Sequence, residues 1–271
     1  YGKRKAATNR PLSFSIRCYD CHVEKRLIQT IKMDAQPSIF LRRKNMLSTI
    51  LWDIDGTLLN FQKAERWSIV KCFSDIGFTK CDDAFLERYS KLNRRYWDML
   101  EHGEISIDRL LTERFTEFFS QEHIPLQDAA AFNHAYQTGL GKVAFPNDDS
   151  IALIKKLKGR VKQFAVTNGT AHAQHLKLKT SGLDQLLDGA FISQEIGFDK
   201  PKTEFFDAVF SSTGIDKKTT AIVGDSLTSD IAGGNSAGIF CIWYNPEGKK
   251  NEKGVRVDAE IKNLWEIESF L

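Results

Sequence analysis

The sequence predicts an α/β fold, with a three-layer core around a Rossmann-like parallel β-sheet and one inserted all-helical domain. Short apolar segments rich in β-branched and aromatic residues alternate with amphipathic segments of helical length. Strands that alternate with helices are joined by right-handed crossovers, which make the strands parallel and cover both faces of the sheet. One long stretch after the first strand carries only helical periodicity. We therefore expect the core at residues 46–60 and 143–271, and the helical domain at residues 61–142.

The elements of the core follow from this alternation. Segments with strand character occur at residues 49–52, 163–167, 189–193, 220–224 and 239–244. Amphipathic segments that predict helices lie between them, near residues 148–158, 171–181, 203–212 and 229–237. The strands are near-continuous apolar runs, as expected when helices bury both faces of a sheet.

The inserted domain shows two apolar stripes at the three- and four-residue spacing of a helix face. The first stripe comprises Phe85, Tyr89, Leu92, Tyr96, Met99 and Leu100, and the second comprises Leu110, Leu111, Phe115, Phe118 and Phe119. We expect these stripes to form the core of the insert, which would lie over the carboxyl edge of the sheet. Phe61 and Trp97 are the aromatic residues expected to face a ligand instead.

The charge of the chain is unevenly distributed. Residues 1–45 contain 11 Lys and Arg against three Asp and Glu, whereas the whole chain of 271 residues has a net charge of only +3. The remainder is thus mildly acidic and gives no indication of binding a nucleic-acid polymer. We expect residues 1–45 to be a disordered upstream extension and Met46 to be the native start.

The cellular location is expected to be the cytoplasm. No apolar run approaches the roughly 18 residues that would span a membrane, and no signal peptide is recognisable. The five cysteines are scattered, which fits a reducing compartment. Cys18–His22 matches the spacing of c-type haem attachment, but without an export signal this reading is disfavoured. His172 and His175 are interpreted as helix surface rather than as zinc ligands.

Polar residues follow successive strands at the edge where ligands bind in an open α/β sheet. They are Asp53, Asp55, Thr167, Asn168, Lys200, Asp225 and Asp230. Asp, Asn, Lys and Gly are poor strand residues, and packing does not explain them at four successive strand ends. Asp-Gly alone would indicate a turn, but the other strand ends favour a catalytic site.

This set of residues suits phosphoryl transfer. Clustered carboxylates repel one another unless a cation neutralises them, and hard oxygen ligands without His or Cys favour Mg²⁺. One carboxylate, Asp53, can attack phosphorus and form an aspartyl phosphate, while Asp55 can donate a proton to the leaving oxygen. Lys200 and the Thr167 hydroxyl would hold the phosphoryl oxygens.

The segments DIDGT, TNG, KP and GDSLTSD, in this order, resemble the four motifs of the haloacid dehalogenase-like (HAD) hydrolase superfamily, and the helical insert resembles its C1 cap. The resemblance covers residues 47–271. It implies that Asp53 is the nucleophile and Asp55 the general acid/base. It also implies a Mg²⁺ site formed by the Asp53 carboxylate, the Asp55 backbone carbonyl and Asp225, with Asp230 supporting it through water or from outside the ligand set. Phosphate binding is assigned in the same way, to Thr167, Asn168 and Lys200.

A closer similarity is to the pyrimidine 5′-nucleotidase group of that superfamily. It rests on FDKPKTEFFDAV, GDSLTSDIAGGNSAGIFCIWYNP and YWDMLEHGEISIDRLLTERF. The resemblance implies hydrolysis of nucleoside monophosphates such as UMP, dUMP and dTMP, so a small-molecule phosphomonoester is expected as the substrate. A phosphoglycolate or sugar-phosphate phosphatase is the alternative. A dehalogenase is disfavoured because it typically lacks the second aspartate; a phosphoglucomutase-type transferase and a catalytically inactive binding module also remain as alternatives.

Overall fold

The computed structural model describes residues 1–2, 47–125 and 128–271. Residues Lys44–Leu271 form one compact unit, which contains both the sheet and the helical insert. The expectations for residues 1–45 and for a start at Met46 fall outside the described residues, apart from Tyr1 and Gly2. The same holds for the haem-like spacing at Cys18–His22.

A six-stranded parallel sheet forms the centre of this unit, with the strand order β3-β2-β1-β4-β5-β6. Its strands are β1 (Thr49–Trp52), β2 (Lys162–Thr167), β3 (Gly189–Ile192), β4 (Thr220–Gly224), β5 (Phe240–Tyr244) and β6 (Ala259–Ile261). All five predicted strands are confirmed to within one residue at either end. Strand β6 was not predicted, because three residues at a sheet edge are too few to show a period. Its place is fixed by pairing with β5.

Strand β1 lies in the middle of the sheet and is covered on both faces, which explains why its residues are apolar or small. Ile50 and Trp52 pack into the core on one face of the sheet, whereas Leu51 packs into the core on the other. Successive side chains of a strand point to opposite faces, so a strand covered on both sides must be apolar throughout.

Helices cover the two faces of the sheet. Residues of α7 (Ser150–Leu157), α8 (Ala171–Ser181) and the 3₁₀ segment Leu264–Phe270 contribute to the core on one face. Residues of α10 (Thr203–Thr213) and α11 (Ala232–Ala237) contribute to the core on the other. The remaining short segments are the 3₁₀ turns Leu183–Gln185 and Lys217–Thr219 and the four-residue helix α9 (Ser193–Ile196).

The segment before α11 differs from the prediction of one continuous helix over residues 229–237. Leu227–Ile231 forms a π-helical turn, in which the Ser226 hydroxyl accepts a hydrogen bond from Ser229 N at 3.1 Å. The carboxylate of Asp230 accepts a hydrogen bond from Ser226 N at 3.1 Å. The wider turn therefore directs Asp230 back towards the end of β4, and such turns occur frequently at functional sites.

Four helices form the described part of the insert between β1 and α7. They are α3 (Phe61–Asp75), α4 (Asp83–Glu101), α5 (Ile107–Gln121) and α6 (Ala129–Lys142). Each begins at an Asn, Asp or Ser whose side chain accepts a hydrogen bond from a backbone N–H of the first turn, as helix N-caps do. The predicted stripes lie in one shared core, in which the ring of Phe73 packs against those of Phe85 and Phe119 at 5.0 and 5.1 Å.

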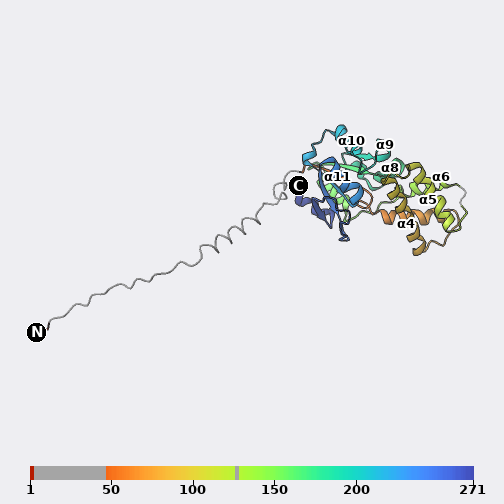
Figure 1. Ribbon diagram of the computed structural model, residues 1–271, viewed down its shortest axis with the longest axis horizontal. Coiled ribbons are helices and arrows are strands. Elements are labelled where there is room, and N and C mark those ends of the chain that lie inside the picture. The colour runs from red at the N-terminus through yellow and green to blue at the C-terminus, as the bar shows by residue number, and fades with distance from the viewer. Residues whose placement is uncertain (3–46, 126–127) are drawn as a thin grey trace. The chain divides into compact units, whose positions relative to one another are not determined.

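The insert is joined to the core unit through α6 and α8. These helices pack closely, and the Thr180 hydroxyl donates to the Gly141 carbonyl at 2.7 Å. In Figure 1, α4, α5 and α6 lie together beside α8. Of the helices in the described ranges, none combines the length and apolar character that crossing a bilayer requires.

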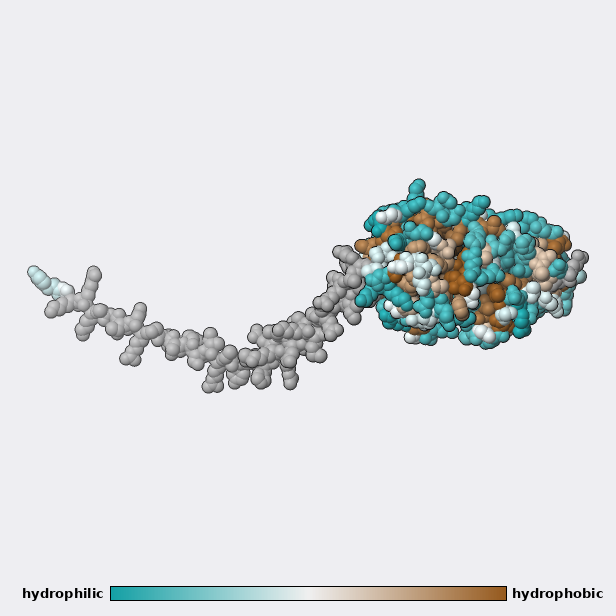
Figure 2. Space-filling view, turned by 90° about the horizontal axis from the view of Figure 1, so that it is seen from above, coloured by the Kyte–Doolittle hydropathy of each residue, from teal (hydrophilic) through white to brown (hydrophobic). Residues whose placement is uncertain are grey.

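On the face shown in Figure 2, hydrophilic and hydrophobic residues are intermixed. Within the described unit, Trp67, Val70, Ile76 and Phe198 are the large hydrophobic side chains that remain exposed. Cys72 and Cys241 are buried, as expected for small apolar groups within elements. His172 and His175 are exposed on α8, which agrees with their interpretation as helix surface.

Candidate active site

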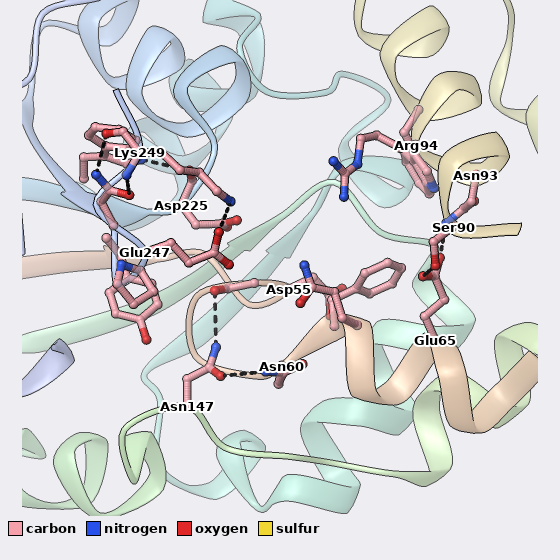
Figure 3. A pocket seen from close by; sticks show the side chains of 18 of the residues that line it. Asp55, Asn60, Glu65, Ser90, Asn93, Arg94, Asn147, Asp225, Glu247 and Lys249 are labelled. Carbon is pink, nitrogen blue, oxygen red and sulfur yellow. Dashed lines mark hydrogen bonds and ion pairs between the residues drawn. The ribbon is translucent and has the colours of Figure 1, made fainter. Parts of the chain in front are cut away.

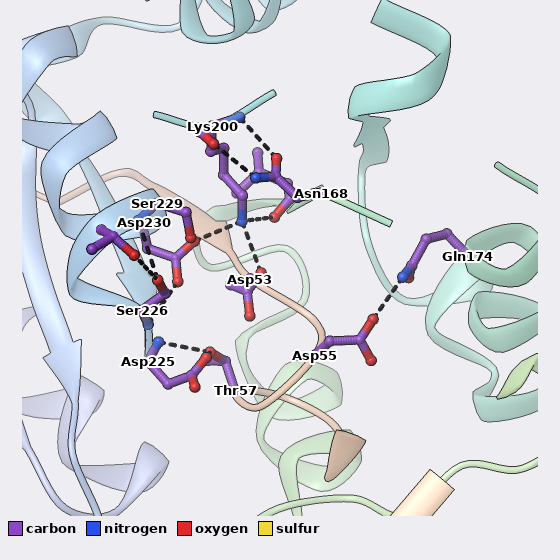
Figure 4. A network of polar contacts seen from close by, with 12 residues as sticks. Asp53, Asp55, Thr57, Asn168, Gln174, Lys200, Asp225, Ser226, Ser229 and Asp230 are labelled. Carbon is purple, nitrogen blue, oxygen red and sulfur yellow. Dashed lines mark hydrogen bonds and ion pairs between the residues drawn. The ribbon is translucent and has the colours of Figure 1, made fainter. Parts of the chain in front are cut away.

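The register of the sheet brings three strand ends to one level. Trp52, the last residue of β1, pairs with Ala165 of β2 and with Val223 of β4. The residues that follow these strands therefore meet at the same edge, and Asp53 N donates to the Val223 carbonyl at 2.9 Å. Figure 4 shows the resulting polar cluster. The side chains that the sequence assigns to one site therefore lie close together at this edge.

Three carboxylates form the centre of the site. Oxygen atoms of Asp53, Asp225 and Asp230 lie within 4.8 Å of one another. Burial, together with Asp230, raises the pKa of Asp53 well above its ordinary value. Asp225 remains open to solvent on one side, but the protein around its carboxylate, together with Asp230, raises its pKa to about 7. In both cases burial is the largest cause of the raised pKa, and repulsion from the neighbouring Asp230 carboxylate adds to it.

Among the described residues, one buried cation contacts this cluster. The Lys200 ammonium donates to Asp53 Oδ1 at 2.8 Å, to Asp230 Oδ1 at 2.6 Å and to the Val166 carbonyl at 2.8 Å. Burial alone would lower the pKa of Lys200, but Asp230 and Asp53 more than offset it and hold the pKa above its usual value. One lysine cannot balance three ionised carboxylates, so full ionisation of the cluster requires a further positive charge.

The residues present fit a hard divalent cation. Asp53 Oδ2 is buried and has no hydrogen-bond partner among the described residues. A buried carboxylate oxygen without a partner is costly and therefore calls for a ligand. The donor set consists of oxygens from Asp53, Asp225 and Asp230 without any His or Cys, which favours Mg²⁺ over a transition metal.

Asp225 is held in place by two residues, Thr57 and Trp243. Neither was predicted to be functional from the sequence. The Thr57 hydroxyl donates to Asp225 Oδ1 at 3.2 Å and accepts from Asp225 N at 3.0 Å. Trp243 Nε1 donates to the Asp225 carbonyl at 3.0 Å. Thr57 belongs to the DIDGT segment, so its position next to the aspartates was the available signal. The sequence offers no such indication for Trp243, because an aromatic residue within a strand is normally predicted to be part of the hydrophobic core.

Gly56 allows the chain to pass close to Asp225. Its φ of +98° lies in the region that favours glycine, and a Cβ there would lie 2.6 Å from Asp225 Oδ2. The Asp-Gly pair does form the expected turn, and this turn also clears the space that the carboxylate occupies.

Asp55 lies beside the three-carboxylate cluster rather than within it. Its Oδ2 accepts from Gln174 Nε2 at 2.7 Å, and its Oδ1 forms an ion pair with Lys177. Both partners come from α8, and sequence reasoning missed them. Their three-residue spacing places them on one helix face, but a Gln and a Lys in a helix normally indicate a solvated surface.

The remaining predicted residues lie in the same pocket. A cavity of about 210 Å³ is lined by Asp53, Asp55, Thr167, Asn168, Lys200, Asp225 and Asp230. The Asn168 side chain is engaged with the backbone of Lys200: it donates to the carbonyl and accepts from the N–H, both at 2.8 Å. Its side chain therefore fixes the Lys200 loop.

A second cavity of about 430 Å³ shares part of its lining with the first (Figure 3). It lies between α3, α4 and residues 245–249, which follow β5. Phe61 and Trp97 line both cavities, in agreement with the expectation that they face a ligand. Beyond the three-carboxylate cluster and Asp55, the charged lining of the larger cavity comprises Glu65, Asp98, Glu101 and Glu247 against Arg94 and Lys249.

The fold and the site together are those of an α/β protein with clustered carboxylates at the carboxyl ends of a parallel sheet. Residues 47–238 match the model of the haloacid dehalogenase-like hydrolase family. YfnB of Bacillus subtilis, described as a HAD-hydrolase, is 33% identical over 224 residues, which cover 82% of this chain and 94% of YfnB. The crystal structure of YfnB bound to magnesium has a TM-score of 0.77, at 32% identity, and the match covers 82% of this chain and 97% of that one.

Two further relatives are named as nucleotidases. The pyrimidine 5′-nucleotidase PynA of Streptococcus pneumoniae is 32% identical, with coverage of 80% of this chain and 92% of PynA. The pyrimidine 5′-nucleotidase YjjG of Escherichia coli is 26% identical, with coverage of 82% and 96%. The chain belongs to the haloacid dehalogenase-like hydrolase family.

Proposed function

We propose that this protein is a Mg²⁺-dependent phosphomonoester hydrolase that acts through an aspartyl phosphate on pyrimidine nucleoside 5′-monophosphates. The observation that carries the proposal is the state of Asp53. One of its oxygens pairs with Lys200, and the other is buried without a partner in the described residues. A carboxylate held in this way is preorganised either to bind a cation or to attack phosphorus.

The Asp53 and Asp225 carboxylates and the Asp55 backbone carbonyl would hold the Mg²⁺, with Asp230 in support. The ion would neutralise the clustered negative charge and the charge of the phosphoryl oxygens. Lys200 would contribute a second positive charge to these oxygens. Thr167 would donate its hydroxyl to the phosphate and Asn168 its backbone N–H, because the Asn168 side chain is engaged with Lys200.

In the first step, a carboxylate oxygen of Asp53 attacks phosphorus and forms an acyl phosphate. The bond from phosphorus to the leaving oxygen breaks, and its electron pair stays on that oxygen, which takes the proton of the Asp55 carboxylic acid. In the second step, the Asp55 carboxylate removes a proton from a water whose oxygen attacks the same phosphorus. The bond from phosphorus to the Asp53 oxygen breaks, and its electron pair returns to the Asp53 carboxylate. Inorganic phosphate leaves, and the protonated Asp55 is regenerated.

Residues 61–142 would act as the cap that encloses the substrate. Their helices α3 and α4 provide one wall of the 430 Å³ cavity, a volume within the range of small-molecule sites. The rings of Phe61 and Trp97 would contact the base, since aromatic side chains stack on nucleobases. The nucleotidase names of PynA and YjjG agree with this use of the cavity.

The charge of the cavity supports a neutral leaving group. Four carboxylates oppose two cations in its wall beyond the catalytic groups, and Glu247 and Lys249 already pair at 3.0 Å. At an effective dielectric constant of about 20, a substrate carboxylate about 8 Å from one such group meets a repulsion on the order of 2 kcal/mol. A nucleoside therefore suits the cavity better than the carboxylate of phosphoglycolate.

The catalytic proposal is tested with a chromogenic aryl phosphate. We expect Mg²⁺-dependent hydrolysis that is abolished by EDTA and by Asp53→Asn, while the variant retains the circular dichroism spectrum of the native protein. Mass spectrometry of the protein quenched in acid should detect one phosphoryl group on Asp53. Activity that survives EDTA or Asp53→Asn would contradict the mechanism.

The substrate proposal is tested with a matched pair of nucleotides. Orotidine 5′-monophosphate differs from UMP by one carboxylate on the base, so we expect its kcat/KM to be at least about tenfold lower. Asp98→Asn should reduce this discrimination, because it removes one negative charge from the cavity wall. Preference for phosphoglycolate or a sugar phosphate over UMP and dTMP would refute the nucleotidase assignment and leave the catalytic proposal intact.

A further inference from the structure

Both oxygens of the Asp55 carboxylate are held by one helix. Gln174 and Lys177 are three residues apart on α8, and both are almost fully buried, with exposed fractions of 2% and 1%. Gln174 donates to one oxygen at 2.7 Å, and the Lys177 ammonium pairs with the other. Residues at this spacing lie on one face of a helix and can therefore act on the same group.

A buried lysine is costly unless it is paired. The Lys177 ammonium meets this requirement through Asp55, and it also lies 5.8 Å from the ring centroid of Phe61, the first residue of the insert. Asp55 itself keeps 22% of its side chain exposed and lines both larger cavities. The cation is thus placed behind a carboxylate that faces the substrate space.

The amide of Gln174 directs its Nε2 towards Asp55 and leaves its Oε1 without a hydrogen bond in the described residues. Its Oε1 is buried without a partner in the described residues, whereas its Nε2 contacts Asp55. An unsatisfied buried carbonyl is unfavourable for stability and needs another explanation. The glycine of the TNG segment accommodates the same amide, because a Cβ at Gly169 would lie 2.0 Å from Gln174 Nε2.

We propose that Lys177 and Gln174 are positioning residues that hold the Asp55 carboxylate where it transfers a proton to the leaving oxygen. The inference rests on the proposed function, in which Asp55 is the general acid. A general acid acts only within hydrogen-bond reach of the reacting oxygen, so a carboxylate free to rotate would lose rate. Contacts to both of its oxygens fix its orientation.

The consequence is a dependence on the leaving group. When the bond between phosphorus and the leaving oxygen breaks, p-nitrophenolate can depart with the electron pair and without a proton. Phenolate, and still more the alkoxide of a nucleoside, needs the proton of Asp55. Loss of positioning should therefore slow the hydrolysis of poor leaving groups selectively, whereas a general loss of folded enzyme slows all substrates equally.

The experiment compares kcat/KM for p-nitrophenyl phosphate, phenyl phosphate and UMP in the Mg²⁺-loaded enzyme. For Lys177→Met and Gln174→Met, we expect the loss to be about tenfold or more larger for phenyl phosphate and UMP than for p-nitrophenyl phosphate. Lys177→Arg should recover part of the difference. Lys179→Met, a change at an exposed lysine on the same helix, is the matched control and should behave as the unaltered enzyme.

The ratio of two activities in one sample does not depend on the folded fraction, so a destabilised variant remains informative. Equal losses on all three substrates would show that Lys177 and Gln174 serve the fold only, and would overturn the inference. Asp55→Asn separates this failure from that of the proposed function. If Asp55→Asn itself shows no leaving-group dependence, the acid role of Asp55 is wrong. If it does, Lys177→Met should add no further dependence in the double variant.

Discussion

At the scale of single residues, Gly56 shows how one position serves both the backbone and the chemistry. Its φ is positive, and its missing Cβ leaves the space that the Asp225 carboxylate occupies. Thr57, the next residue, then holds that carboxylate by a hydrogen bond. The turn therefore determines where the proposed metal ligand lies.

Gly56→Ala is expected to lower Mg²⁺ affinity and to reduce activity by about 10²-fold or more, because a displacement near 1 Å is that costly in a preorganised site. Isothermal titration with Mg²⁺ and steady-state kinetics measure the two effects. Gly77→Ala is the matched control: its φ is also positive, but nothing lies within 4 Å of the added Cβ. It should lose stability and keep Mg²⁺ affinity. Equal Mg²⁺ binding by both variants would contradict this role of Gly56.

At the scale of elements, the contact between α6 and α8 joins the insert to the helix that carries Gln174 and Lys177. Both residues contact the Asp55 carboxylate, so a shift of α8 would change the position of that carboxylate. At its other end, the insert reaches the site through Glu101 of α4, which accepts a hydrogen bond from the Thr228 hydroxyl at 2.9 Å. Burial raises the pKa of Glu101.

Gly141→Ala should destabilise the protein although alanine normally favours a helix. An added Cβ would lie 2.3 Å from Leu176 Cβ, which forces α6 and α8 apart at a cost of about 1–3 kcal/mol. Thermal unfolding measures the change. Leu176→Gly in the same chain removes the Cβ that the new methyl group would meet, so the double variant should be less destabilised than the two single effects predict. Simple additivity would show that the two helices are not coupled here.

At the scale of the whole molecule, the carboxylate cluster makes stability depend on pH and on metal. In the metal-free protein the pKa of Asp225 is about 7 and that of Asp53 is also raised, whereas the unfolded chain has ordinary values near 4. Between these limits the folded state binds more protons than the unfolded state. The contribution of these groups to stability is therefore lost as the pH rises through about 7.

Mg²⁺ should reverse this loss by neutralising the ionised cluster. We expect the increase in Tm on adding Mg²⁺ to be larger at pH 8 than at pH 5.5, because protons compete with the metal at the lower pH. Differential scanning calorimetry at both pH values measures it. Asp225→Asn should abolish most of the increase, while Asp207→Asn, at an exposed site on α10, should not. An increase that is independent of pH would contradict the assignment of the site.

The class of fold, and the sheet edge at which the polar residues gather, could be predicted from the sequence alone. Near-continuous apolar segments and amphipathic segments indicate directly which residues are buried, and so predict the strands and helices. The aspartates at the ends of β1 and β4 stand out in the sequence because packing does not explain them. The partners of each carboxylate are visible only in the folded chain: Asp53 and Asp230 pair with Lys200 next to Asp225, whereas Asp55 pairs with residues of α8. Such partners cannot be predicted from local patterns, because ion pairs such as Lys177 with Asp55 join positions more than a hundred residues apart.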